Sequence, residues 1–193
     1  MSSFATSGPV WYLMRASGVV TLILLTGVFV LGIATTNRWR VRRLPGFAAL
    51  GLHRSISLLS IVFLGIHVVT AVVDPYAAVG VAAVVVPFLA GKSALWVGLG
   101  AVSLDLTLAL IVTSLLRRHL SLRVWRGIHW VAYLSWPLAL VHSLGVGSDT
   151  GTVWLRGIAG ACIGLVVAAV AWRLRHAGGP AKHLEPRAAH LVA

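Results

Sequence analysis

Residues 44–73 read LPGFAALGLHRSISLLSIVFLGIHVVTAVV, an apolar stretch long enough to cross a bilayer as a single helix. It carries two histidines, His53 and His67, which are fourteen residues apart. Fourteen residues fall roughly 40° short of four full helical turns and rise about 21 Å. The two rings are therefore expected on one face of the helix, at clearly different depths in the membrane.

A second stretch, VWRGIHWVAYLSWPLALVHSLG at residues 124–145, repeats the arrangement with His129 and His142, thirteen residues apart. An imidazole inside hydrocarbon is costly and marks a functional site by default. Two such helices predict two metal centres stacked across the membrane. Thirteen residues miss four turns by roughly 140°, and an internal proline permits a kink. We therefore expect this helix to be irregular near residues 136–137, where Pro137 lies.

Composition places the chain among integral membrane proteins. Of its 193 residues, 59% are hydrophobic and only 10% are charged, and the mean hydropathy is +0.94. A soluble domain would carry about 25% charged residues. The net charge of +12 comes from short basic clusters between apolar runs, as the positive-inside rule requires, so no nucleic-acid partner is implied.

The apolar runs predict an all-α bundle of five transmembrane helices at residues 16–36, 47–73, 93–116, 124–145 and 152–175. Residues 75–91 are apolar but short and contain Pro87, so we expect a re-entrant or interfacial segment there. The predicted divisions are an outer segment at 1–10, a transmembrane domain at 11–175 and a flexible cytoplasmic tail at 176–193.

Charge placement orients the predicted bundle with its N-terminus outside and its C-terminus in the cytoplasm. Of the 16 Lys and Arg residues, only Arg15, Lys92 and Arg156 then lie outside. A sixth span at 75–91 would move the cluster at 117–126 outside and spoil this bias. The expected location is the cell membrane, as a multi-pass protein, and the Ala-, Val- and Arg-rich composition suits a bacterial inner membrane.

Five spans make the two histidine-bearing helices parallel. His53 then pairs with His129 near the cytoplasmic side, and His67 pairs with His142 towards the outer side. Each pair offers two imidazoles and no nearby carboxylate or thiolate, and the single cysteine, Cys162, excludes an iron–sulfur cluster held by this chain alone. Zinc prefers four protein ligands, whereas haem supplies four nitrogens of its own, so two bis-histidine haems fit best.

Two other classes of function remain open. A metal-ion transporter could use the histidines to handle a hydrated cation, although more acidic or Ser and Asn residues would then be expected beside them. A structural or assembly subunit could use the histidines to join helices.

Several further residues are candidates for the same site. Arg54 and Arg126 flank the inner histidines and are possible partners for haem propionates, or ordinary positive-inside anchors. Asp105, near the middle of a predicted span, could relay protons, hold a histidine's second nitrogen or bond a neighbouring helix. Gly51, Gly65 and Gly127 each precede a histidine by two residues and could make room for a flat macrocycle.

Six segments carry a resemblance to a known family: LHRSISLL at 52–59 with GIH at 65–67, VPF at 86–88, TSLLRR at 113–118, and WRGIHW with YLSWPLALVH within 125–142. The chain resembles the ferric reductase-like transmembrane domain of ferric reductases, NADPH oxidases and the haem subunit of the periplasmic methionine sulfoxide reductase system. The resemblance covers about residues 10–175.

The resemblance implies two b haems, with His53 and His129 as ligands of the inner iron and His67 and His142 as ligands of the outer iron. It also implies electron flow from a cytoplasmic flavin towards an outer acceptor, such as ferric iron or a partner redox protein. Large members of the family carry a fused flavin and nicotinamide domain, and we expect none in this chain. The expected role is therefore the haem-binding electron-transfer subunit of an oxidoreductase, with flavin or NAD(P)H chemistry supplied by a separate cytoplasmic partner.

Overall fold

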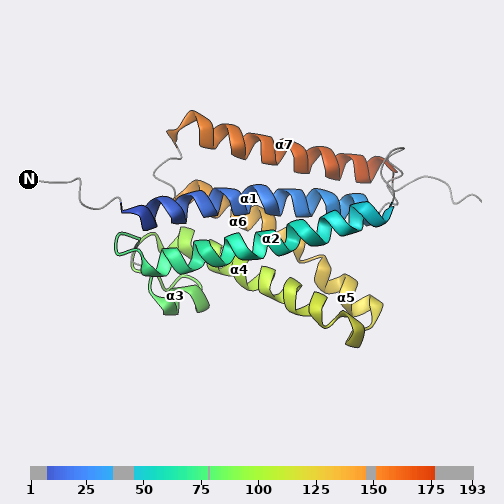
Figure 1. The fold of residues 1–193 in the computed structure, drawn as a ribbon, viewed down its shortest axis with the longest axis horizontal. Coiled ribbons are helices and arrows are strands. Elements are labelled where there is room, and N and C mark those ends of the chain that lie inside the picture. The colour runs from blue at the N-terminus through green and yellow to red at the C-terminus, as the bar shows by residue number, and fades with distance from the viewer. Residues whose placement is uncertain (1–7, 37–45, 78, 147–150, 177–193) are drawn as a thin grey trace, which may run out of the picture.

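Two antiparallel helix pairs make up most of the molecule. The computed structural model describes residues 8–36, 46–77, 79–146 and 151–176, and every regular element within these ranges is a helix. Helix α1 (Pro9–Thr36) packs along α2 (Gly46–Val73), and α4 (Ala94–Leu115) packs along α6 (Ala132–Val146). Helix α7 (Val153–His176) lies along α1 on the side away from α4 (Figure 1).

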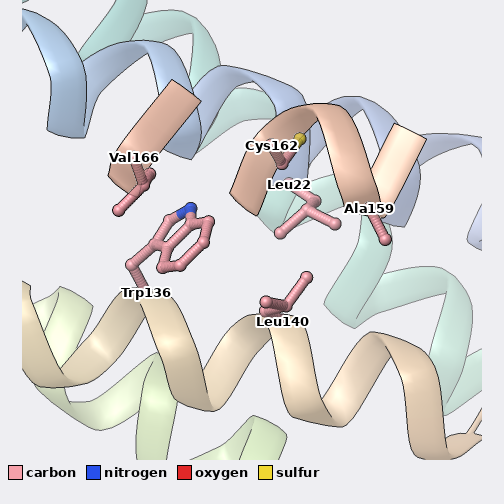
Figure 2. Packing of buried hydrophobic residues seen from close by; sticks show 6 residues of the cluster. All are labelled: Leu22, Trp136, Leu140, Ala159, Cys162 and Val166. Carbon is pink, nitrogen blue, oxygen red and sulfur yellow. The ribbon is translucent and has the colours of Figure 1, made fainter. Parts of the chain in front are cut away.

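The buried core lies where α1, α6 and α7 meet. Figure 2 shows Leu22 of α1 between side chains of α6 and α7; the cluster consists of Leu22, Trp136, Leu140, Ala159, Cys162 and Val166. Polar atoms inside this region are paired, since the Trp136 indole Nε1 donates to Thr26 Oγ1 at 3.0 Å. The sole cysteine is thus part of the packing and only 4% exposed.

Apolar side chains also cover the outside of the bundle. Along α2, Leu58, Val62 and Val69 are each more than half exposed, which water would penalise and lipid favours. Within the described ranges, four helices are long and apolar enough to cross a membrane: α1, α2, α4 and α7. The chain is therefore a multi-pass membrane protein. Helix α1 begins at Pro9, earlier than the expected span at 16–36.

The described residues between α2 and α4 include no helix long enough to span a membrane. Asp74 Oδ1 accepts main-chain bonds from the N–H groups of Tyr76 and Ala77, which ends α2 in a tight turn. The five-residue helix α3 (Val81–Val85) follows and packs on α4. Phe88, with a φ of 67°, then lies so close to Gly98 of α4 that any side chain at that glycine would meet its ring.

The irregularity expected near Pro137 lies elsewhere. Helix α6 continues through Pro137, and the break falls between α5 (Leu122–His129) and α6, at Trp130 and Val131. Val131 N–H bonds to the Ile128 carbonyl and Tyr133 N–H to that of Trp130, so the backbone tightens into i→i+3 turns there. The expected fourth span, at 124–145, is thus two shorter helices, and the break directly follows His129.

Other expectations about the ends of the chain fall on undescribed residues. Arg38, Arg40, Arg42 and Arg43 lie in 37–45, and the predicted tail lies almost wholly in 177–193, outside the described ranges.

Candidate functional site

His67 and His142 face each other between α2 and α6. Their ring centroids are 6.3 Å apart and their planes are inclined by 77°. We call the end of the bundle that holds them, where α2 ends and α4 begins, the His67 end, and the opposite end the His53 end. Because α2 and α6 run in the same direction between these ends, the structure brings together the histidines that the sequence pairs.

Main-chain carbonyls fix the ring orientation of three histidines. The Nδ1 atom of His67 lies 2.9 Å from the Met14 carbonyl oxygen, that of His53 lies 3.1 Å from Val28 O, and that of His142 lies 2.8 Å from Trp96 O. A carbonyl oxygen only accepts, so Nδ1 carries the proton in each ring. The lone pair is then on Nε2, as a metal ligand requires.

A glycine lies four residues after each of these carbonyls. Gly18 follows Met14, Gly32 follows Val28, and Gly100 follows Trp96. In an α-helix the residue at i+4 lies directly beside the carbonyl of residue i. A side chain at that position would stand between the carbonyl and an approaching ring, so we call each carbonyl and its glycine a bracket.

The three brackets differ in tightness. A Cβ atom at Gly100 would come within 2.5 Å of His142 Nδ1, and one at Gly18 within 2.9 Å of His67 Nδ1. A Cβ atom at Gly32 would meet His53 Cε1 at 3.5 Å, an ordinary contact. Both rings at the His67 end are therefore enclosed as only glycine permits, and His53 is held less closely.

His129 has no bracket. It is the last residue of α5, its ring stacks on Trp125 with a centroid distance of 4.5 Å, and the planes are inclined by 28°. Its Nδ1 atom is buried and makes no hydrogen bond within the described part of the chain. His129 lies near enough to His53 for an electrostatic interaction between the two rings.

A cavity of about 500 Å³ opens beside His67 and His142. Its walls are mainly apolar, with Leu22, Leu64 and Leu104 among them. Arg15 and Lys92 also line it. Arg15 lies over the Trp11 ring at 4.7 Å, and Lys92 over the Tyr76 ring at 5.6 Å. An apolar pocket with two imidazoles and two cations suits a flat apolar group that carries anionic substituents.

The pair at the His67 end fits a bis-histidine haem. A metal–imidazole bond is roughly 2 Å long, so two imidazoles on opposite sides of one iron place their centroids roughly 6 Å apart. The observed 6.3 Å matches. Within the described residues, no group of three or more His, Cys, Asp or Glu side chains comes together, which argues against a closed zinc site held by this part of the chain.

The remaining candidates take less part in the geometry. Arg54 and Arg126 are exposed at the His53 end. Asp105 is exposed in the middle of α4, and carbonyls, not this carboxylate, hold the Nδ1 atoms of His53, His67 and His142. Cβ atoms at Gly51, Gly65 or Gly127 would meet open space.

Sequence reasoning missed the bracket glycines and Lys92. A signal for two of the glycines exists, because Gly18 and Gly32 are fourteen residues apart, the same spacing as His53 and His67. In an antiparallel pair of helices, equal spacings put both glycines opposite both histidines. Gly100 has no such counterpart: His129 and His142 are thirteen residues apart, and the residue thirteen after Gly100 is Thr113.

Fold and site together define a multi-pass helical membrane protein with paired histidines between its helices. Residues 17–140 match the family model described as the ferric reductase like transmembrane component. The chain belongs to this family, which makes it a membrane redox subunit. The match includes His53, His67 and His129 and ends two residues before His142. No curated protein and no solved structure matches the chain.

Proposed function

We propose that the chain is a cytochrome b subunit that carries electrons across the membrane through two stacked bis-histidine b haems. The observation that carries this proposal is the facing pair His67 and His142, 6.3 Å apart, with Nδ1 of each ring bonded to a carbonyl. Both Nε2 lone pairs remain available to one iron. The approach of His53 and His129 supports a second site of the same kind.

The chain's residues have separate tasks in this proposal. Haem iron held by two imidazoles supplies one-electron transfer without a change of ligands. His67 and His142 hold one iron, and His53 and His129 hold the other. The apolar walls of the cavity exclude water from the first site, and Arg15 and Lys92 offer positive charge to carboxylates on the bound group.

The proposed direction follows from charge. Arg117, Arg118, Arg123 and Arg126 are exposed at the His53 end, which the positive-inside rule assigns to the cytoplasm. Electrons would enter there from a separate flavin-containing or NAD(P)H-dependent donor. They would leave at the His67 end to ferric iron or a partner redox protein.

The test is a dithionite-reduced minus oxidised absorption spectrum of the purified protein, with haem quantified against protein as the pyridine haemochrome. We expect two low-spin b haems per chain. His142→Ala and His53→Ala should each lower the content or convert one haem to another spin state. A colourless protein from cells with ample haem would overturn the proposal and favour the metal-ion transporter.

A further inference from the structure

The two histidine pairs differ in the number of hydrogen bonds and close contacts that hold their rings. At the His67 end, both rings have a carbonyl partner, and both face a glycine at a distance that excludes any Cβ atom. At the His53 end, one ring has a carbonyl partner and an ordinary contact at its glycine, and the other ring has neither.

His129 also lies directly beside a break in the helical backbone. It ends α5, and the next two residues form the turn that separates α5 from α6. His142, in contrast, lies inside α6, and the Trp96 ring packs against Gly145 one turn further on. Rotation of the His129 ring therefore disturbs only its stack on Trp125. Rotation of the His142 ring would break its hydrogen bond to the Trp96 carbonyl and is limited by the close contact with α4 at Gly100.

From this difference we propose that His129 is an exchangeable ligand, and that the metal site at the His53 end takes a small external ligand of haem iron. This inference rests on the proposed function. In the exchange, the bond from iron to His129 Nε2 breaks and a bond from iron to the external ligand forms, with no change in the number of electrons. Gly18 and Gly100 are positioning residues that prevent the same exchange at the His67 end.

Carbon monoxide added to the dithionite-reduced, haem-loaded chain tests the proposal, because it binds ferrous haem only where an axial position opens. We expect about half of the haem to react, since one site of two exchanges its ligand. Trp125→Leu should leave that fraction unchanged and speed the reaction several-fold to about tenfold, the range that loss of one aromatic stack gives. Trp130→Leu is the matched control, because Trp130 stacks on Tyr133, centroid distance 5.1 Å.

The glycines identify which haem reacts. Gly100→Ala forces the ring of His142 away, so the fraction that binds carbon monoxide should rise from about half towards all of the haem. Gly27→Ala is the control: Gly27 also lies between α1 and α2, and its Cβ would meet Ile56 at an ordinary 3.8 Å. The fraction should stay at about half in this variant.

The outcomes separate the two proposals. A wild-type chain without haem overturns the proposed function itself. A wild-type chain with two low-spin haems that bind no carbon monoxide, even with Trp125→Leu, overturns only the exchangeable ligand. The exchangeable ligand is also overturned if Trp125→Leu enlarges the fraction of haem that binds carbon monoxide while Gly100→Ala only speeds the binding. In that case the haem that reacts in the wild-type chain is the one at the His67 end. If Gly100→Ala does not fold, Gly18→Ala, with the milder 2.9 Å approach to His67, replaces it.

Discussion

Trp96 contacts the segment around His142 at two points. Its carbonyl oxygen lies 2.8 Å from His142 Nδ1, and its indole ring packs against Gly145, three residues further along α6. One residue of α4 thus sets both the ring orientation of the histidine and the distance between α4 and α6. The site at the His67 end therefore depends on helix packing as much as on the histidines.

Gly145→Ala should disturb this contact directly. The added methyl group would overlap the Trp96 ring, and overpacking of this kind costs about 1–3 kcal/mol. We expect a lower unfolding temperature in detergent and a lower haem content. Gly157→Ala is the control, because a Cβ there meets open space in α7, and removal of a helical glycine stabilises by about 0.4–1 kcal/mol. Equal stability of the two variants would contradict the packing role of Trp96.

Thr26→Val should destabilise the core without touching a histidine. Trp136 Nε1 donates to Thr26 Oγ1 inside the interface of α1 and α6. Valine keeps the shape and leaves the buried indole N–H unpaired, which costs about 1–3 kcal/mol. Thermal unfolding in detergent measures the loss. Thr113→Val should change stability by less than about 0.5 kcal/mol, because the Thr113 hydroxyl bonds only to carbonyls of its own helix.

Cys162 should be unreactive in the folded chain. Its side chain is 4% exposed and packs with Leu22 and Trp136, so a thiol reagent reaches it only when α7 separates from α1. We expect no labelling by a maleimide in mild detergent and complete labelling in denaturant. Rapid labelling of the folded protein would show that α7 does not pack on α1 as described.

Asp105→Asn should leave the haem content unchanged. None of the three bonded Nδ1 atoms uses this carboxylate, and the side chain is exposed in the middle of α4. Pyridine haemochrome quantitation compares the variant with the wild-type chain. Loss of one haem would mean that Asp105 reaches a ligand in the loaded protein, as a proton relay or a bond to His129 would require.

Much of the fold follows from hydropathy and charge, because a bilayer forces apolar runs into helices that satisfy their own backbone. The all-helical membrane architecture and the family are confirmed. Hydropathy carries less information about breaks. The run at 124–145 predicts one helix, yet the chain forms α5 and α6 there and tightens after His129, not at Pro137.

The bracket glycines are the part of the site that is hardest to predict from the sequence. Glycine is common in membrane helices for many reasons, so proximity in sequence favoured Gly51, Gly65 and Gly127. The residues that contact the rings, Gly18 and Gly100, lie on other helices. The spacing of Gly18 and Gly32 matches that of the histidines, but the register of the antiparallel pairs is needed to place each glycine beside a ring, and that register comes from packing.

The orientation of the bundle can be tested at the two ends of α4. In a Cys162→Ala background, Ser93→Cys and His119→Cys place single exposed thiols just before and just after this helix. If the basic end faces the cytoplasm, a membrane-impermeant maleimide added to intact right-side-out vesicles labels only Ser93→Cys, and His119→Cys reacts after the vesicles are opened. The reverse pattern would invert the orientation and move the proposed electron entry to the opposite face. Labelling of both thiols from one side would show that α4 does not cross the membrane.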